Sequence, residues 1–355
     1  MSKVGVLIIQ LGTPDAPTPA AVRRYLREFL DDPRVIEVPR WRWWFVLNFM
    51  ILPRRSKESA AKYARIWDVR TGSPLLHVTK LQTRALENSL PDGIVVRYGM
   101  RYGNPGIAQA VGELSDAGVD RLIVLPLYPQ YSAASTGTAC DRLFQALAQR
   151  RYVPAIRIVP PFYAHPAYIH AQTELIREEV AKLDRPPQKY VFSFHGYPRD
   201  FVQKGDRYRD HVEVTASLLA RELGLGGGDW LLTYQSRFGR QVWLEPYTEE
   251  TLCELARKGI RRVLVASPGF TADCLETIDE IGREAAESFR RAGGELLIRC
   301  PCLNDHPAWI QAMRQIVLEE SQGWRSKGSQ PHGTDDELIH GLGGESTVLD
   351  VERSD

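Results

Sequence analysis

Two short segments carry the residue types best suited to chemistry. VFSFHGYP at Val191–Pro198 brings a histidine to the end of an apolar strand and into a glycine-proline turn, and KGDRY follows at Lys204–Tyr208. DCLETIDE at Asp273–Glu280 brings carboxylates to the start of an acidic helix behind a second apolar strand. Imidazole titrates near neutral pH and binds metal ions, and carboxylates bind metals and carry protons. The pairing predicts a site that handles a metal ion and protons together.

The composition restricts which classes of protein this site can belong to. The chain has 355 residues, of which 43% are hydrophobic and 25% charged, and this is enough for a sizeable core divided between two domains. Lys and Arg number 45 against 44 Asp and Glu, so no global field attracts nucleic acid and we predict no such partner. Five cysteines without a CxxC pair argue against a disulfide scaffold or a zinc knuckle and fit a reducing cytosol.

Membrane-related signals are confined to one segment. The apolar N-terminal run has the length of a buried strand and no cleavage site after it, so we predict a cytoplasmic protein. The longest apolar run elsewhere, Trp43–Leu52, is about half of the roughly 20 residues that a spanning helix needs. Basic residues flank it, and it suits either a core helix or a peripheral contact with the inner face of a membrane. The hypothesis of a membrane contact rests on Trp41, Trp43 and Trp44.

An internal repeat organises the chain. HPAYIHA from His165 recurs as HPAWIQA from His306, and LGTP from Leu11 resembles HGYP from His195. The repeat indicates a duplication, in which His165 and His306 mark equivalent helix boundaries.

Apolar runs without polar alternation predict strands that are covered on both faces, as in parallel sheets. These runs are Val4–Leu11, Ile94–Met100, Leu122–Leu127, Ile156–Val159, Tyr190–Phe194, Trp230–Gln235, Val263–Ala266 and Leu296–Arg299. The predicted fold class is α/β, with two similar Rossmann-like domains, each built on a parallel four-stranded sheet, around an interdomain cleft.

The repeat also predicts the domain boundaries. We expect an N-terminal α/β domain at 1–164 with an inserted lip at about 38–75, and a C-terminal α/β domain at 165–305. A final helix at 306–321 is expected to pack back on the first domain. The segment 322–355 is rich in small and polar residues and is predicted to be a poorly ordered tail, in which we assign no chemistry to His332 and His340.

Ordered motifs along almost the whole chain resemble those of the ferrochelatase family, enzymes that insert ferrous iron into a porphyrin. They are LGTP at Leu11, GSP at Gly72, RY at Arg101, PLYPQYS at Pro126, SFHGYP at Ser193, GDRY at Gly205, WLEP at Trp243 and PGFTADCLET at Pro268. The resemblance implies a porphyrin cleft between two similar domains, with a catalytic, metal-binding histidine at His195 and its partner carboxylate at Glu276.

Porphyrin metallation explains why these side chains would be needed. The ring must lose two pyrrole protons and receive a metal ion that has shed water. A neutral imidazole at His195 is the preferred proton acceptor, and the carboxylate of Glu276 opposite it would bind Fe²⁺ or carry protons. Which of the two delivers the metal is left open. Glu276, Glu280 and Glu284 recur every fourth residue, so they predict a proton or metal relay along one helical face.

The resemblance also implies substrate contacts. Leu11, Tyr63, Tyr128, Trp243 and Phe270 are candidates to grip and bend the macrocycle, although each taken singly also suits a protein core. Arg55 and Ser73 match positions near the porphyrin carboxylates, and Arg101 lies near the reacting face. Cys274 replaces a histidine found in some relatives and is expected to pack as a small apolar residue.

The predicted function is insertion of Fe²⁺ into protoporphyrin IX. The alternatives are a chelatase for coproporphyrin or another tetrapyrrole, and a porphyrin or haem carrier without catalysis. The resemblance favours protoporphyrin, because relatives that use the more acidic coproporphyrin often have tyrosine where this chain has Leu11. Fe²⁺ is a substrate, and no permanently bound cofactor is expected. Some relatives hold an iron-sulfur cluster through cysteines in the C-terminal segment and near PQYS; Ala133 and Ala134 follow that motif, and no cysteine follows Cys302, so we predict no such cluster.

Overall fold

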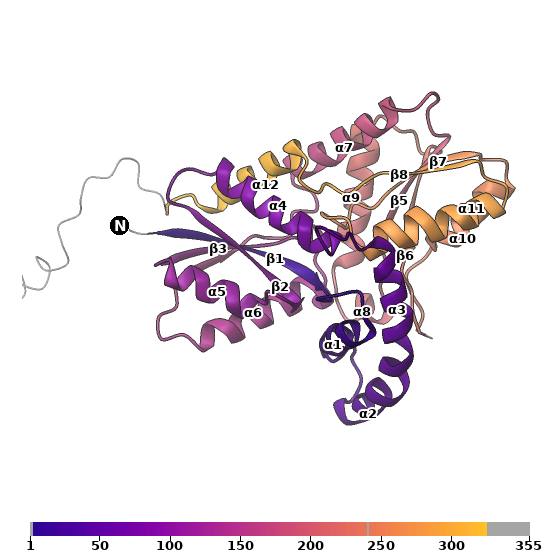
Figure 1. Ribbon diagram of the computed structural model, residues 1–355. Coiled ribbons are helices and arrows are strands. Elements are labelled where there is room, and N and C mark those ends of the chain that lie inside the picture. The colour runs from indigo at the N-terminus through magenta and orange to yellow at the C-terminus, as the bar shows by residue number, and fades with distance from the viewer. Residues whose placement is uncertain (1–2, 240, 325–355) are drawn as a thin grey trace, which may run out of the picture. The chain divides into compact units, whose positions relative to one another are not determined.

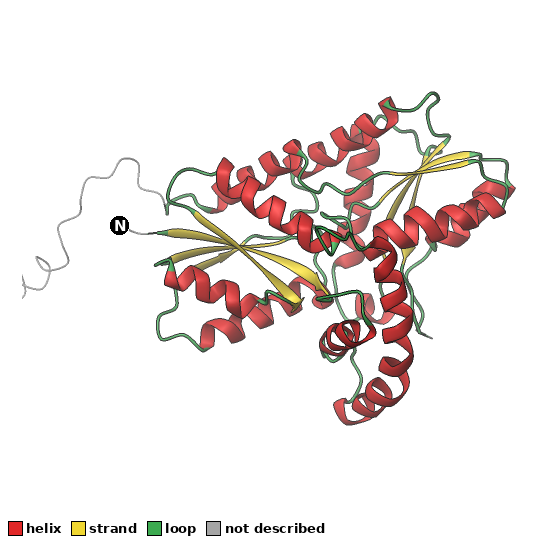
Figure 2. Ribbon diagram, viewed as in Figure 1, coloured by secondary structure: helices red, strands yellow, loops and turns green. Residues whose placement is uncertain are grey.

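The architecture consists of two parallel sheets of identical topology. In the computed structural model, which describes residues 3–239 and 241–324, all helices and strands belong to one compact unit that ends at Ser321. The two sheets are separate (Figure 2). The first has the strand order β2-β1-β3-β4 and the second β6-β5-β7-β8. The strands are β1 Val4–Thr13, β2 Val95–Gly103, β3 Arg121–Pro126, β4 Ala155–Ile158, β5 Lys189–His195, β6 Trp230–Gln235, β7 Arg262–Ala266 and β8 Leu296–Arg299.

Every strand predicted from the apolar runs is present, with ends that differ by a few residues, and all pairings are parallel. The equal strand order confirms that the chain contains a duplication. The fold is therefore α/β with two parallel four-stranded sheets, as the sequence predicts.

Helices cover both faces of the sheets (Figure 1). In the first half they are α1 Pro19–Leu30, α2 Arg40–Phe45, η1 Val46–Ile51, α3 Leu52–Ile66, α4 Pro74–Ser89, α5 Ile107–Asp116, η2 Ala133–Gly137, α6 Thr138–Ala148 and α7 Pro166–Ala181. In the second half they are α8 Arg199–Gln203, α9 Tyr208–Glu222, α10 Thr248–Arg257, η3 Glu276–Ala285, α11 Ala286–Arg291 and α12 Pro307–Glu320. The η segments are π-helical, and η2 and η3 follow the equivalent strands β3 and β7.

Each sheet has its own core on one face. Side chains of β1 and β3 pack with α5 and α6 in the first half, where Leu7, Val124 and Leu143 are fully buried. The equivalent core of the second half packs β5 and β7 against α10 and η3, and it includes the fully buried Val191 and Val265. Burial on both faces of the central strands accounts for their unbroken apolar sequences.

The two histidine-proline sites of the repeat begin equivalent helices. His165 caps α7 and His306 caps α12, and the Nδ1 atom of each accepts a hydrogen bond from the backbone N–H two residues later. The Nε2 of His165 lies 3.0 Å from Glu319 at the end of α12, and the Nε2 of His306 lies 3.2 Å from Glu178 near the end of α7. The prediction that both histidines are helix-boundary residues is confirmed.

Helix α12 packs against α4 and β3 of the first half and against its counterpart in the repeat, α7. Trp309, which is fully buried, contacts Phe162 and Tyr168 through ring centroids 5.7 and 6.1 Å apart. The boundaries proposed for the two α/β domains stay a prediction. Most of the segment predicted as a tail, including His332 and His340, lies outside the described residues.

The inserted segment between β1 and β2 carries an aromatic surface. Trp43 is buried, and its indole N–H donates to the carbonyl of Leu30 at 2.6 Å. It is therefore not available for the membrane contact in which the sequence analysis had included it. The exposed aromatic and apolar side chains of α2 and η1 are Trp41, Trp44, Phe45, Phe49 and Met50, which we call the lip surface. Within the described residues, no helix is long and apolar enough to cross a membrane.

Replacing Trp309 by Ala is predicted to lower the free energy of unfolding by about 3–5 kcal/mol, because it leaves a cavity among tightly packed rings. Replacing Trp41, which is 66% exposed, by Ala should change the free energy of unfolding by less than about 0.5 kcal/mol. Urea denaturation of both variants measures the difference. Equal effects of the two substitutions would contradict the packing described for α12.

Candidate functional site

One cavity lies at the carboxyl ends of the central strands of both sheets, where parallel α/β folds bind their ligands. Most of the residues predicted as site residues line it: Leu11, Tyr63, Ser73, Tyr128, His195, Trp243, Phe270 and Glu276. Leu11 comes from the end of β1 and His195 from the end of β5, the equivalent strands of the two halves. The duplicated fold therefore brings an apolar side chain and an imidazole to the same cavity.

The imidazole of His195 has a defined hydrogen-bond partner. Its Nδ1 lies 2.7 Å from the carbonyl oxygen of Gly196, and because a carbonyl only accepts, Nδ1–H is the donor. In the neutral ring Nε2 then carries the lone pair. The ring centroid lies 6.4 Å from that of Phe270, another residue of the cavity wall. The arrangement leaves Nε2 as the nitrogen that can accept a proton or bind a metal ion.

The turn after His195 requires glycine and is supported by the GDRY motif. A Cβ on Gly196 would lie 2.6 Å from the carbonyl oxygen of Gln235, closer than any side chain tolerates. The hydroxyl of Tyr208 donates to the carbonyl of His195 at 2.9 Å. Asp206 accepts hydrogen bonds from the Tyr197 hydroxyl and from the backbone N–H of Ala133, both at 2.7 Å. These contacts tie the His195 turn to η2 of the first half.

Glu276 is the first residue of η3 and a second polar group of the cavity wall. Its backbone carbonyl accepts a hydrogen bond from Nε2 of Gln235 at 2.9 Å, and Gln235 in turn accepts from the hydroxyl of Ser193 at 2.7 Å. Ser193 and His195 share strand β5. A short chain of buried hydrogen bonds therefore connects the strand of the histidine to the start of the glutamate helix.

Asp273, at the start of the DCLET motif, has a structural role. It accepts hydrogen bonds from Arg299 at 2.7 Å, from Thr277 at 2.8 Å and from Asn304 at 2.9 Å. Cys274 beside it is buried with Leu75 and other apolar residues, so the prediction that it packs as a small apolar residue is confirmed. Burial, followed by the charge of Glu276, raises the pKa of its thiol, which favours the protonated form.

Hydroxyl groups line the wall that the first half contributes. Oγ1 of Thr13 lies 2.8 Å from Oγ of Ser73, and the rings of Tyr25 and Tyr63 meet edge to face at 6.4 Å. Burial and then the charge of Glu276 raise the pKa of Tyr63 well above its ordinary value. The sequence analysis did not single out Thr13 and Tyr25. Thr13 belongs to the LGTP motif and could have been found there, whereas no motif marks Tyr25 on α1.

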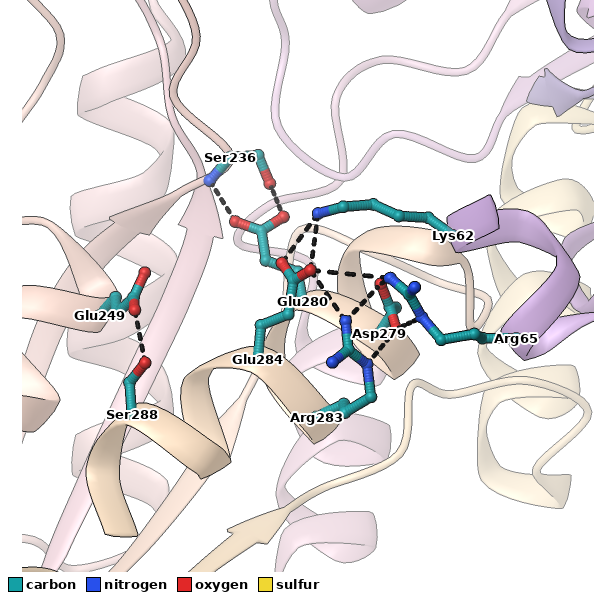
Figure 3. Close-up of polar contacts among 9 residues, drawn as sticks. All are labelled: Lys62, Arg65, Ser236, Glu249, Asp279, Glu280, Arg283, Glu284 and Ser288. Carbon is teal, nitrogen blue, oxygen red and sulfur yellow. Dashed lines mark hydrogen bonds and ion pairs between the residues drawn. The ribbon is translucent and has the colours of Figure 1, made fainter. Parts of the chain in front are cut away.

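The carboxylates of Glu280 and Glu284 do not line the cavity. Glu280 accepts hydrogen bonds from the backbone N–H of Ser236, at 2.6 Å, and from its hydroxyl, and burial raises its pKa. Glu284 lies 2.8 Å from Nζ of Lys62 and 2.9 Å from Arg283 (Figure 3). The helix that bears them is π-helical rather than α-helical. The relay along these residues stays a prediction, and Glu284 at its outer end is already paired with three cations, Lys62, Arg283 and, at 3.8 Å, Arg65.

Asp279, which the sequence analysis did not consider, is the most enclosed carboxylate of η3, with 2% of its side chain exposed. Arg65 donates to both of its oxygens at 3.0 and 2.8 Å, and Arg283 donates to both at 2.6 and 3.3 Å. Burial alone would raise its pKa, but the hydrogen bonds from Arg65 and Arg283 outweigh burial and lower it to about 2.

Two predicted substrate contacts lie outside the cavity wall. The guanidinium of Arg101 donates to Asp32 and, at 2.6 Å, to the hydroxyl of Thr138, so it joins a buried network of the first half. Arg55 stands over the ring of Phe238, 5.9 Å from its centroid, and Phe238 lines the cavity. Substrate contact by these two arginines stays a prediction.

Residues 3–239 and 241–324 contain no group of three or more His, Cys, Asp or Glu side chains placed to hold a metal ion. His195 and Glu276, the two metal-binding side chains that the sequence predicted, both line the cavity. Metal binding by these two side chains stays a prediction. The absence of an iron-sulfur cluster remains an expectation.

Comparison with solved structures defines the class of fold. The chain resembles SirB from Bacillus subtilis with Fe³⁺ (TM-score 0.53, 13% identity, covering 91% of this chain and 97% of that chain). It also resembles CbiX, the terminal enzyme for siroheme biosynthesis in denitrifying bacteria (TM-score 0.50, 12% identity, covering 89% and 98%). At these identities the likeness concerns the fold, which is that of a chelatase-like α/β protein.

The match of the sequence to a family model is more specific than the likeness in fold. The sequence matches the family model described as Ferrochelatase over residues 3–321, which is nearly the whole of the described chain. The protein belongs to the ferrochelatase family. The family and the fold together indicate a tetrapyrrole metal chelatase.

The ion pairs of Asp279 should make stability depend on pH. Because the pKa is lower in the folded than in the unfolded protein, their contribution is fully present above about pH 4 and is lost as the pH falls toward about 2. The stability gap between the wild type and Asp279→Asn should therefore be largest near neutral pH and shrink at about pH 3. Urea denaturation of both proteins at each pH measures the gap. A stability difference between the two proteins that does not vary with pH would contradict the lowered pKa of Asp279.

Proposed function

We propose that this protein inserts Fe²⁺ into protoporphyrin IX, releasing two protons and giving protohaem, the last step of haem biosynthesis. The observation that carries the proposal is that His195 and Glu276 line one cavity in a chain of the ferrochelatase family. A wall made of Leu11, Trp243 and Phe270 on the same cavity suits a flat apolar ring.

The reaction balances without an oxidant or a reductant. Two pyrrole N–H bonds break, the protons leave, and four ring nitrogens bind the metal ion, which stays Fe²⁺. In the proposal Nε2 of His195 accepts the two pyrrole protons one at a time and releases the first before it takes the second, because Nδ1 is already a donor to the carbonyl of Gly196. Glu276 is proposed to bind the metal ion or pass protons outward. Both residues are the proposed catalytic and metal-contacting groups.

Leu11 favours protoporphyrin over the more acidic coproporphyrin. It lines the cavity at the end of β1, at a position where the resemblance places tyrosine in many coproporphyrin-using relatives. Ser73 and Arg55 are proposed to hold the porphyrin carboxylates, and Ser73 is the one whose side chain reaches the cavity wall. A chelatase for another tetrapyrrole is the second candidate within the same class.

Metallation of protoporphyrin under anaerobic conditions tests the proposal. The wild type should convert the porphyrin Soret band to that of the metallated product with repeated turnover. Replacing His195 by Ala should lower kcat at least about 100-fold, since general base catalysis contributes a factor of this order. Porphyrin binding, followed by fluorescence quenching, should persist in the variant.

The alternatives give different results in the same assay. Stoichiometric porphyrin binding without metallation by the wild type would identify a carrier, and faster metallation of coproporphyrin or sirohydrochlorin would identify another chelatase. Turnover by His195→Ala at the wild-type rate would overturn the assigned role of the imidazole.

We also propose that the protein works in the cytoplasm and contacts the inner face of a membrane through the lip surface. The support is an exposed aromatic group, in which Trp44, Phe45 and Phe49 contact one another, beside the basic residues Arg40 and Arg42. Aromatic side chains next to cations suit the interface of an anionic bilayer.

Replacing Trp44 and Phe49 by Ser should reduce sedimentation with phosphatidylglycerol vesicles by at least about 10-fold, since two large apolar contacts are lost. Phe144→Ser on α6 is the matched control, because Phe144 is as exposed as Trp44, at 51%. Sedimentation that the double substitution leaves unchanged would refute the membrane contact.

A further inference from the structure

An ion-pair cluster centred on Asp279 joins two elements that are far apart in the sequence. It consists of Asp279, Glu284 and Arg283 from η3 and of Lys62 and Arg65 from α3 (Figure 3). We call it the Asp279 cluster. Helix α3 belongs to the inserted segment of the first half, whereas η3 belongs to the second half. The cluster therefore fixes the insertion against the other half of the molecule.

The cluster differs in burial from the other cross-links of the insertion. Lys204, just after α8, also reaches across, to Glu37 at 2.7 Å, but both side chains are substantially exposed, and such pairs contribute little to stability. Asp279 is 2% exposed and holds two guanidinium groups, each through two hydrogen bonds. Paired double hydrogen bonds of this kind define orientation as well as distance.

Both helices that meet at the cluster supply a residue to the cavity wall. Tyr63 lies two residues before Arg65 on α3, and Glu276 lies three residues before Asp279 on η3. Tyr63 belongs to a buried cluster against which Leu275, the residue before Glu276, packs, so α3 and the start of η3 meet beside the cavity. A shift of α3 relative to η3 would thus change the spacing of these two groups.

The local structure of η3 increases the need for support. A π-helix has a wider turn than an α-helix, and it appears mostly as short segments at functional sites. Within η3 the guanidinium of Arg283 braces Asp279 one turn earlier, while Arg65 approaches the same carboxylate from α3. Loss of the charge at Asp279 would leave Glu284 as the one carboxylate of the cluster that pairs with both arginines, at 3.8 Å from Arg65 and 2.9 Å from Arg283.

We propose that Asp279 is a positioning residue, which holds the π-helix and α3 so that Glu276 and Tyr63 keep their spacing across the cavity. It acts through these two residues and does not itself line the cavity. The inference rests on the proposed metallation function, since it concerns the geometry of Glu276 in that reaction.

Asp279→Asn keeps the shape of the side chain and removes its charge. We expect kcat for protoporphyrin metallation to fall about 10- to 100-fold, because displacement of a catalytic group by about 1 Å costs this much. KM should change far less, since Leu11, Trp243 and Phe270 grip the ring from other elements. Rates are divided by the number of sites that bind porphyrin in a fluorescence titration, which removes the effect of any unfolded fraction.

Arg65 gives a second test that does not depend on the buried carboxylate. Arg65→Gln should lower kcat in the same direction, and Arg65→Lys should restore part of the loss, because a lysine keeps the charge but forms one hydrogen bond instead of two. Arg65 is 40% exposed, so these variants should fold even if Asp279→Asn does not.

Two matched controls separate positioning from loss of an ordinary ion pair. Lys204→Gln removes the exposed cross-link to Glu37, and Glu58→Gln removes the pair with Arg54 on the outer side of α3. Both variants should keep the wild-type kcat.

The outcomes distinguish the two proposals. A wild-type protein that binds porphyrin without metallating it would refute the proposed function. A second outcome is an active wild type together with Arg65→Gln, and any folded Asp279→Asn, whose kcat per binding site equals that of Lys204→Gln. This outcome would leave the proposed function standing and overturn the positioning role of Asp279. A lowered kcat with nearly constant KM, and partial rescue by Arg65→Lys, would support it.

Discussion

Strands of a parallel sheet all end at the same edge, and this constraint determines where the chemistry of the protein lies. Two sheets with the same strand order present their carboxyl ends to one cavity, so the residues that end β1 and β5 both line it. Equivalent positions are occupied by different side chains, Leu11 in one half and His195 in the other. The duplication thus brings an apolar side chain of one half and an imidazole of the other to the same cavity, and both His195 and Glu276 come from the second half.

The insertion between β1 and β2 breaks the symmetry of the two halves. It adds Tyr63 to the cavity wall and carries Arg65 to Asp279 on the helix of Glu276. The same segment presents the lip surface, with Trp43 buried beneath it as an anchor. A single added segment therefore contributes to the cavity, to the support of the glutamate helix and to an exposed aromatic surface.

Periodicity and motifs were sufficient for the fold and for much of the cavity, because strand ends and short motifs are local properties of the sequence. The eight apolar runs gave the strands, and LGTP, SFHGYP and DCLET marked residues that line the cavity. Contacts between distant segments were not accessible in this way. The sequence named Trp43 among the candidate membrane contacts and Arg101 among the candidate substrate contacts, but no local pattern showed that Trp43 donates to the carbonyl of Leu30 or that Arg101 donates to Asp32. The π-helical form of η3 and the ion pair of Arg65 with Asp279 also depend on tertiary packing, so they cannot be predicted from a local sequence pattern.

The central claim is that a flat ring is held between an imidazole and a carboxylate in this cavity. A crystal structure of the protein with bound protoporphyrin tests it most directly. We predict the ring between Leu11 and the His195–Glu276 pair, with Nε2 of His195 within hydrogen-bond reach, about 3 Å, of a pyrrole nitrogen. A porphyrin bound outside the cavity, or bound there with both His195 and Glu276 facing only its carboxylate edge, would contradict the account.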